Sequence, residues 1–180
     1  LMSWNKLKIN EELSKHHQEF DALIDRLPLE VFEDNSADKL SAGQLQKHII
    51  LSLKPIVLAM RLPKFLLRYQ FGLTNRPSRS YEELVARYLK ALDGRAAVAP
   101  KRFTPKQIGR EAKQQQTIQF NKLINRLMQL VHKWSEDDLD LYVIPHPLMG
   151  KLTFREILYF TIYHVKHHKK QMDAIVKTKK

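Results

Sequence analysis

The chain has 180 residues, 43% of them hydrophobic, which is enough for one domain with a buried core and argues against a disordered chain. It has no cysteine, so disulfides, thiolate metal ligands and cysteine nucleophiles are excluded, and a reducing cytoplasm is the expected location. The formal net charge of +12 would attract nucleic acid, anionic lipid or acidic small molecules, or would only keep the surface soluble.

Two long helices are predicted in the N-terminal part. The apolar pattern of residues 20–27 recurs at helical spacing and ends before Pro28, where a first helix should stop. Ser41 and Gln44 form a capping-box pattern, which predicts that a second helix begins there. Pro55 should kink or interrupt this helix. Its inward face is predicted to carry Leu45, His48, Ile49, Ser52 and Ile56.

The central part predicts one short helix and one long helix. A capping box and Gly94 delimit the short helix at residues 81–93, and residues 95–103 are expected to form a linker. Thr104, followed by Pro105, is a favourable start for the long helix. The apolar face of that helix is Phe120, Leu123, Ile124, Leu127, Val131 and Trp134.

The C-terminal part predicts a polar turn, an irregular loop and a last helix. The turn is expected at residues 135–138. Residues 144–147 contain two prolines and should not be helical, and Gly150 adds a turn. Thr153 begins a further capping box, which opens a helix that ends near Val176.

Together these elements predict an all-α fold. We expect a four-helix bundle with a long crossover connection between the second and third helices, which carries the extra short helix. Residues 1–180 are expected to form a single domain of this kind. The N-terminal residues are too polar for a signal peptide, and no apolar run is long enough to span a bilayer. We therefore expect a cytoplasmic protein without membrane contact.

The last helix carries the most informative residues. His164 and His168 are four residues apart, so their imidazoles project from the same face, one turn apart. The inward-facing line that contains them is Ile157, Thr161, His164, His168, Gln171 and Ile175. His167 lies on the flanking line, nearer the edge of the bundle. Gln171 could orient His168 or a bound water, or it could be a surface residue.

A third histidine, His48, lies on the inward face of the second helix. Since neighbouring helices of a bundle lie about 8–10 Å apart, His48 can meet His164 and His168 around one ion, in a site with open positions for water or substrate. The alternative is that these are core histidines satisfied by other partners, and spacing alone leaves both open.

Gln44 could support His48 or only cap its helix, and His146 could border the site or only shape its turn. The remaining histidines are predicted to lie at the surface: His16, His17 and His132.

Three stretches of the chain resemble the DinB-like family of metalloenzymes. Residues 41–49 match the helix opening that delivers the first histidine of the family. Residues 145–153 are similar to the Pro-His-Pro…Gly-x-Leu-Thr turn of one subgroup, and residues 164–171 to the final His-x-x-His-His-x-x-Gln. The three stretches occur in the family's order and, with the predicted bundle, cover most of the chain.

The resemblance implies an antiparallel four-helix bundle that holds a divalent metal ion, commonly zinc or nickel. The ligands would be His48, His164 and His168, with the fourth position left for water. Better-understood relatives are low-molecular-weight thiol S-transferases and a thiol-dependent maleylpyruvate isomerase, in which the metal binds the cofactor thiol as a thiolate. Residues 64–102 match nothing in the family, so the substrate stays open.

The sequence therefore predicts a metal-dependent enzyme of transferase or hydrolase type that acts on a small-molecule substrate. The ion would lower the pKa of a bound water or thiol, and no catalytic residue beyond the ligands is assigned. The alternative is a non-catalytic basic helical bundle that serves as a binding or dimerisation module. A homodimer is compatible with either hypothesis. No nucleic-acid recognition motif is present, so nucleic acid is not an expected partner.

Overall fold

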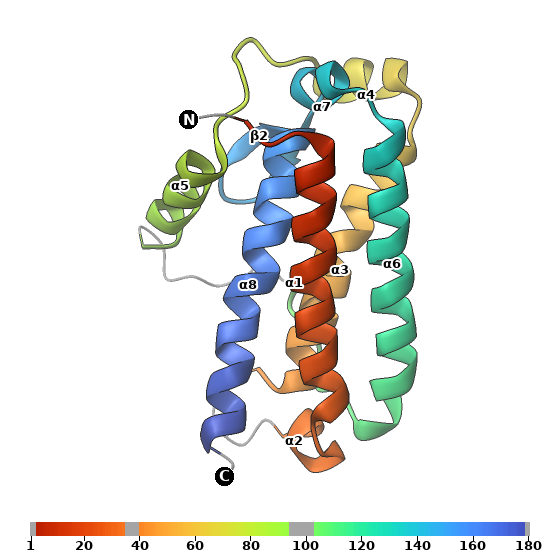
Figure 1. Cartoon of the computed structure of the whole chain (residues 1–180), viewed down its shortest axis with the longest axis vertical. Coiled ribbons are helices and arrows are strands. Elements are labelled where there is room, and N and C mark those ends of the chain that lie inside the picture. Colours follow the sequence, from red (N-terminus) through yellow and green to blue (C-terminus); the bar gives the residue numbers. More distant parts are fainter. Residues whose placement is uncertain (1–2, 35–39, 94–102, 179–180) are drawn as a thin grey trace.

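Four long helices form an elongated bundle in the computed structural model, which describes residues 3–34, 40–93 and 103–178 (Figure 1). They are α1 (Lys6–Arg26), α3 (Ala42–Arg61), α6 (Lys113–Lys133) and α8 (Phe154–Thr178). Both α1 and α3 pack against α6 and α8. Because α1 and α8 run one way and α3 and α6 the other, two of these four packed pairs, α1–α6 and α3–α8, are antiparallel, whereas α1–α8 and α3–α6 are parallel (Figure 1). The predicted all-α fold is confirmed, whereas a fully antiparallel arrangement is not found.

Capping boxes start three helices where the sequence predicts them. Ser41 Oγ accepts from the backbone N–H of Gln44 at 3.1 Å, and Gln44 Oε1 accepts from the backbone N–H of Ser41 at 2.9 Å. Equivalent boxes open α5 (Tyr81–Asp93) and α8. Each box satisfies two backbone donors that a helix start leaves unpaired. The predicted stop at Gly94 and the linker residues 95–102 lie outside the described residues.

The crossover from α3 to α6 contains several short elements. Besides α5 they are α4 (Lys64–Phe71) and the 3-10 turn η2 (Arg110–Ala112). The prediction that the long helix begins at Thr104 and Pro105 is wrong, because α6 begins only at Lys113. The backbone carbonyls of Phe103 and Pro105 accept hydrogen bonds from side chains of α3. These bonds help to hold the segment, of which residues 104–109 are not helical, against α3.

Proline does not break α3. The helix runs without interruption from Ala42 to Arg61, with Pro55 inside it. The side chain of Pro55 is exposed, so its ring lies on the solvent side of the helix and away from the core. The predicted interruption therefore does not occur, although Pro55 still lacks the backbone donor of an ordinary helical residue.

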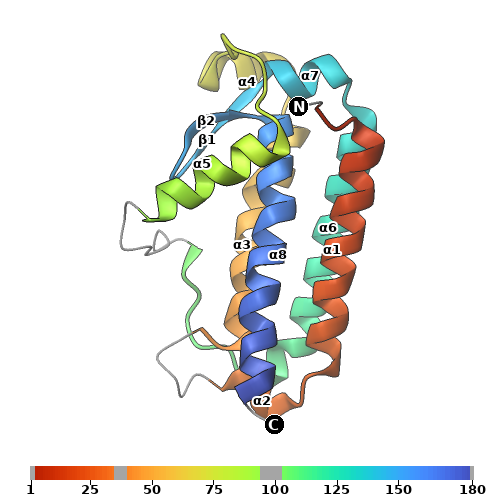
Figure 2. The same cartoon turned by 60° about the vertical axis from the view of Figure 1, so that its left-hand side comes forward.

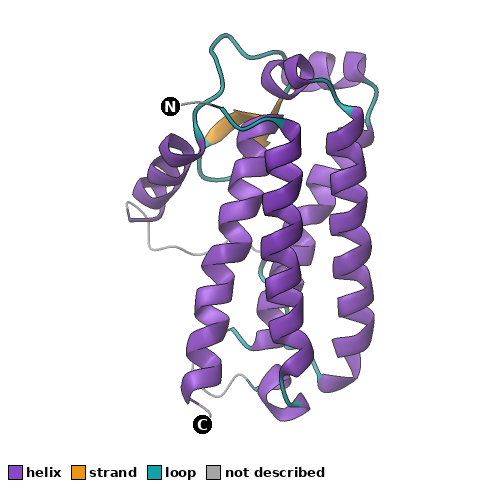
Figure 3. Ribbon diagram, in the orientation of Figure 1, coloured by secondary structure: helices purple, strands orange, loops and turns teal. Residues whose placement is uncertain are grey.

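Small elements that the sequence patterns did not predict close the two ends of the bundle (Figure 3). They are α2 (Leu29–Glu33), α7 (Glu136–Leu141) and a hairpin of β1 (Val143–His146) and β2 (Gly150–Thr153). The predicted polar turn is the start of α7, where Ser135 accepts from the backbone N–H of Asp138. Pro145 pairs with Lys151 in the hairpin, which tolerates proline because, within the described residues, each of its strands pairs with one other strand.

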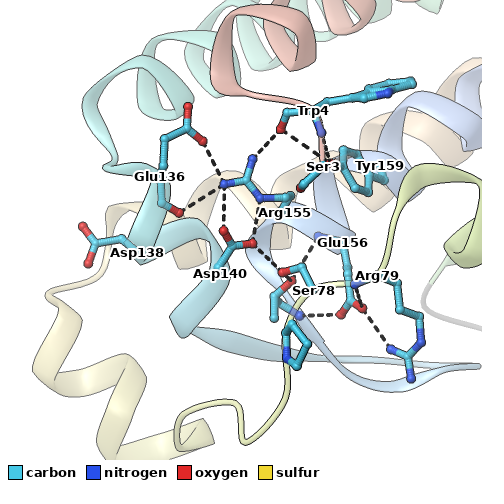
Figure 4. Close-up of polar contacts among 12 residues, drawn as sticks. Ser3, Trp4, Ser78, Arg79, Glu136, Asp138, Asp140, Arg155, Glu156 and Tyr159 are labelled. Carbon is cyan, nitrogen blue, oxygen red and sulfur yellow. Dashed lines mark hydrogen bonds and ion pairs between the residues drawn. The ribbon is translucent and has the colours of Figure 1, made fainter. Parts of the chain in front are cut away.

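The first turn of α8 is held by buried charges (Figure 4). Glu156 has no exposed surface, and its carboxylate accepts two hydrogen bonds from Arg76, at 2.8 and 2.9 Å, and one from the guanidinium of Arg79. Arg155 is buried and pairs with Asp140 at 2.7 Å. These bonds tie α8 to α7 and to the segment before α5, so they help to place the helix that carries two of the candidate ligands.

The hydrophobic core lies between the four long helices and includes one unexpected polar residue. His17 is 1% exposed, and its ring centroid lies 5.7 Å from that of Phe120. Its predicted surface position is wrong, because the buried face of α1 continues from Leu13 through His17 to Phe20. Of the helices described, none combines the length and apolar character that a membrane span requires.

Candidate metal centre

Three histidines that are far apart in the sequence meet between α3 and α8. His48 and His168 are each 8% exposed, and His164 is 5% exposed. The Nε2 atom of His164 lies 3.0 Å from Nε2 of His48 and 2.9 Å from Nε2 of His168. The structure thus brings together all three residues that the sequence predicts as ligands, with one ring nitrogen from each within 4.8 Å of the others.

Local structure explains why the three rings converge. The capping box at Ser41 sets the start of α3, and His48 follows two turns later among the buried residues Leu45 and Ile49. On α8, His164 and His168 are one turn apart and both face inward. Since α3 and α8 are neighbours in the bundle, these inward faces oppose one another.

Hydrogen bonds on the outer side orient two of the rings. Nδ1 of His48 donates to the backbone carbonyl of Phe103 at 2.7 Å. Nδ1 of His168 donates to Oε1 of Gln171 at 2.7 Å. Because these oxygens can only accept, the Nδ1 atoms carry the protons and the Nε2 lone pairs face the cluster. Gln171 therefore orients His168, whereas the side chain of Gln44 caps α3 and also donates to the carbonyl of Pro105.

The nitrogen cluster fits a divalent ion better than it fits neutral imidazoles alone. His48 and His168 both present an Nε2 lone pair to His164, whose Nε2 has at most one proton to share between two contacts. Two nitrogens bound to one ion at roughly 2.0–2.1 Å, with an angle of about 90–110°, are roughly 2.8–3.4 Å apart. The two separations that involve His164 Nε2, 3.0 and 2.9 Å, match this spacing, and one nitrogen from each of the three rings lies within 4.8 Å of the others. Imidazole donors suit zinc and nickel, among other transition metals.

Burial keeps the three imidazoles in the neutral form that binds metals. It lowers the pKa of His48 below the ordinary value and lowers that of His168 to about 3. The pKa of His164 is also held well below the ordinary value, because burial acts together with the repulsion that positive charge on His168 and His48 would exert.

An aromatic group packs against the cluster on the side of α5, which lies across the outer side of α8 (Figure 2). The ring of Phe160 stacks on His164 with centroids 4.9 Å apart, and Tyr88 of α5 packs on Phe160. His146 contacts Phe160 from the hairpin, and its Nδ1 accepts from the backbone N–H of Leu148. His146 therefore shapes its turn, as one interpretation of the sequence predicts, and it does not belong to the three-nitrogen cluster.

His167 lies outside the cluster. Its side chain is partly exposed, and its Nε2 lies 3.3 Å from the amide nitrogen of Gln171. The predicted position at the rim is thus confirmed. The ring of His167 also contacts that of His168, at a centroid distance of 5.2 Å.

A small cavity lies beside His164. Its volume is about 10 Å³, close to the space that one water molecule needs. The lining residues are Ile49, Ser52, Leu53, Ile56, Phe160, Thr161 and His164. Sequence reasoning placed Ser52 and Thr161 on the inward faces of their helices but assigned them no role. Their spacing from the histidines could have indicated a place near the site, because Ser52 is four residues after His48 and Thr161 is three residues before His164.

The family model described as the DinB superfamily matches residues 12–172. Among solved structures, an uncharacterized protein from Clostridium difficile 630 is similar, with 13% sequence identity and a TM-score of 0.57 over 98% of each chain. At this identity the similarity supports the fold alone. The search of curated proteins gave no match.

Proposed function

Because the chain belongs to the DinB superfamily, we propose that it is a metal-dependent enzyme in which His48, His164 and His168 hold a divalent ion. The observation that carries the proposal is the convergence of three buried Nε2 atoms, two of which have their Nδ1 protons engaged elsewhere. Neutral, oriented imidazoles of this kind are typical metal ligands. Zinc and nickel are the ions that we propose.

Three protein ligands leave coordination positions for a further small ligand. When bound, a divalent ion at such a site lowers the pKa of a coordinated water or thiol and so supplies a nucleophile near neutral pH. The residues of the chain exclude bulk solvent, since all three ligands are nearly buried and Phe160 covers one side of His164. We propose a small-molecule substrate, with either water or a low-molecular-weight thiol as the activated ligand.

The metal content of the purified chain tests this proposal. We expect close to one zinc or nickel ion per chain by mass spectrometry after loading and dialysis. His164→Ala and His168→Ala should each abolish this retention, whereas His132→Ala, which changes an exposed histidine of α6, should leave it unchanged. A parent chain that retains no divalent ion after loading would overturn the proposal. Equal retention by the His164→Ala variant would do the same.

A further inference from the structure

The cavity beside His164 has two hydroxyl-bearing residues in its lining, in addition to the imidazole of His164 itself. Ser52 comes from α3 and Thr161 from α8, and the remaining walls are mostly aliphatic side chains and Phe160. Ser52 follows His48 by four residues, and Thr161 precedes His164 by three. Because α3 and α8 run in opposite directions, Ser52 and Thr161 are both displaced from these histidines toward the same end of the bundle. Both hydroxyls therefore lie about one helical turn from the candidate metal ligands and on the same side of them.

The two hydroxyl groups have already used their protons. Ser52 Oγ donates to the backbone carbonyl of His48 at 2.9 Å. Thr161 Oγ1 donates to the backbone carbonyl of Ile157 at 2.8 Å. A hydroxyl has one proton and two lone pairs, so both oxygens are left as hydrogen-bond acceptors. The two hydroxyl oxygens that line the cavity can therefore accept hydrogen bonds from a bound molecule but cannot donate to it.

We propose that Ser52 and Thr161 hold one water molecule beside His164 by accepting its two protons, and that they thereby favour water over a thiolate as the small ligand of the metal centre. This inference rests on the proposed function, because it concerns the ligand that completes the three-histidine site. A water bound in this way directs its lone pairs away from the two hydroxyls.

Size and charge both support this preference. The cavity of about 10 Å³ is close to the minimum for one water, and a buried water needs two to four polar partners, of which the hydroxyls supply two. A thiolate brings a larger atom and no proton, so its negative charge would face two oxygen lone pairs among apolar walls. Desolvation without a compensating hydrogen bond is unfavourable. The pair therefore favours neutral water over a thiolate as the small ligand.

Binding of a thiol to the cobalt-loaded chain tests the preference without measuring activity. The probe is 2-mercaptoethanol, and the readout is the near-ultraviolet charge-transfer absorption that a cobalt–sulfur bond produces. Thr161→Val keeps the shape of the side chain and removes the acceptor, so we expect it to bind the thiol roughly tenfold more tightly than the parent chain does. Ser52→Ala should act in the same direction. Thr117→Val, which removes a hydroxyl on α6 that bonds to Gln46 and does not line the cavity, is the matched control and should behave as the parent.

The outcomes separate this inference from the proposed function. If parent and variants retain cobalt equally and bind the thiol with the same affinity, the role of Ser52 and Thr161 is overturned while the metal centre stands. If the parent chain retains no cobalt, both fail. A high-resolution crystal structure of the parent supplies a second measurement that does not depend on the variants folding. We expect an ordered water within hydrogen-bond distance of Ser52 Oγ and Thr161 Oγ1, and a cavity without electron density would overturn the inference.

Discussion

The Nδ1 atom of His48 donates a 2.7 Å hydrogen bond to the backbone carbonyl of Phe103, so the crossover connection orients a side chain of the candidate metal centre. The two residues are 55 positions apart. Gln171 does the equivalent for His168 from within the same helix. The ring of His48 is thus oriented by a backbone group of a distant segment, and that of His168 by a side chain of its own helix. Of these two hydrogen-bond acceptors, only the amide of Gln171 can be removed by mutation.

Removal of the amide of Gln171 should weaken metal binding. We expect Gln171→Ala to lower the affinity for zinc by about tenfold to a hundredfold, because His168 loses the acceptor that fixes its tautomer and ring orientation. The measurement is competition with a chromophoric chelator. Gln171→Glu keeps an acceptor oxygen and should retain most of the affinity, and Lys170→Ala changes an exposed neighbour as the control. An unchanged affinity in Gln171→Ala would show that the hydrogen bond has no role in binding.

Metal binding should stabilise the fold, because the three ligands come together only in the native state. At a free zinc concentration of a hundred times Kd, the free energy of unfolding should rise by about 2.7 kcal/mol. For a chain of this length, that corresponds to an increase of roughly 5–10 °C in Tm. Differential scanning calorimetry with zinc and with excess chelator measures the difference. The His164→Ala variant should show no such increase, and an equal increase in that variant would place the ion elsewhere.

Glu156 should contribute strongly to stability at neutral pH. Its carboxylate is fully buried and accepts from Arg76 and Arg79, so Glu156→Gln leaves two guanidinium groups without their anion. We expect a loss of about 3–5 kcal/mol in the free energy of unfolding, measured by urea denaturation. Glu82→Gln, at an exposed position of α5, should change stability by less than about 0.5 kcal/mol.

The same carboxyl group should produce acid sensitivity. Burial acts to raise the pKa of Glu156, but the hydrogen bonds from Arg76 and from the backbone N–H groups of Arg79 and Thr153 outweigh it, so the pKa lies below the ordinary 4.5. A depressed pKa in the folded state means that the stabilisation is present above pH 4.5 and is lost as the pH falls through the folded-state pKa. Urea denaturation between pH 6 and pH 3 should show a smaller loss for Glu156→Gln than for the parent. Parallel curves would contradict the assignment.

His17 should add a second acid-sensitive contribution at higher pH. Burial lowers its pKa from 6.5 to about 4, so the folded chain keeps His17 neutral while the unfolded chain takes up a proton. Stability should therefore fall by about 3 kcal/mol as the pH drops from 6.5 to 4, in metal-free protein. His17→Leu removes this contribution and also removes a buried Nε2 that has no hydrogen-bond partner within the described part of the chain. Its stability should depend less on pH over this range, and the exposed His132→Leu should behave as the parent.

Local signals explain which elements could be predicted. The capping boxes at Ser41, Ser80 and Thr153 depend on residues within three positions of each other, so the starts of α3, α5 and α8 follow from sequence. Thr104 and Pro105 carry an equally favourable local signal, yet the segment is not helical. Contacts of the neighbouring carbonyls with α3 outweigh that local preference.

The sequence by itself determined the all-α class, and it determined that His164 and His168 face the same way, because a helical period of 3.6 residues places side chains without reference to the rest of the chain. Only the tertiary structure decided that His48 reaches them, since that contact spans 116 positions and depends on how α3 packs against α8. The cavity between Ser52 and Thr161 was decided in the same way. A cavity arises where two helix surfaces meet, and periodicity along one helix contains no information about the surface opposite.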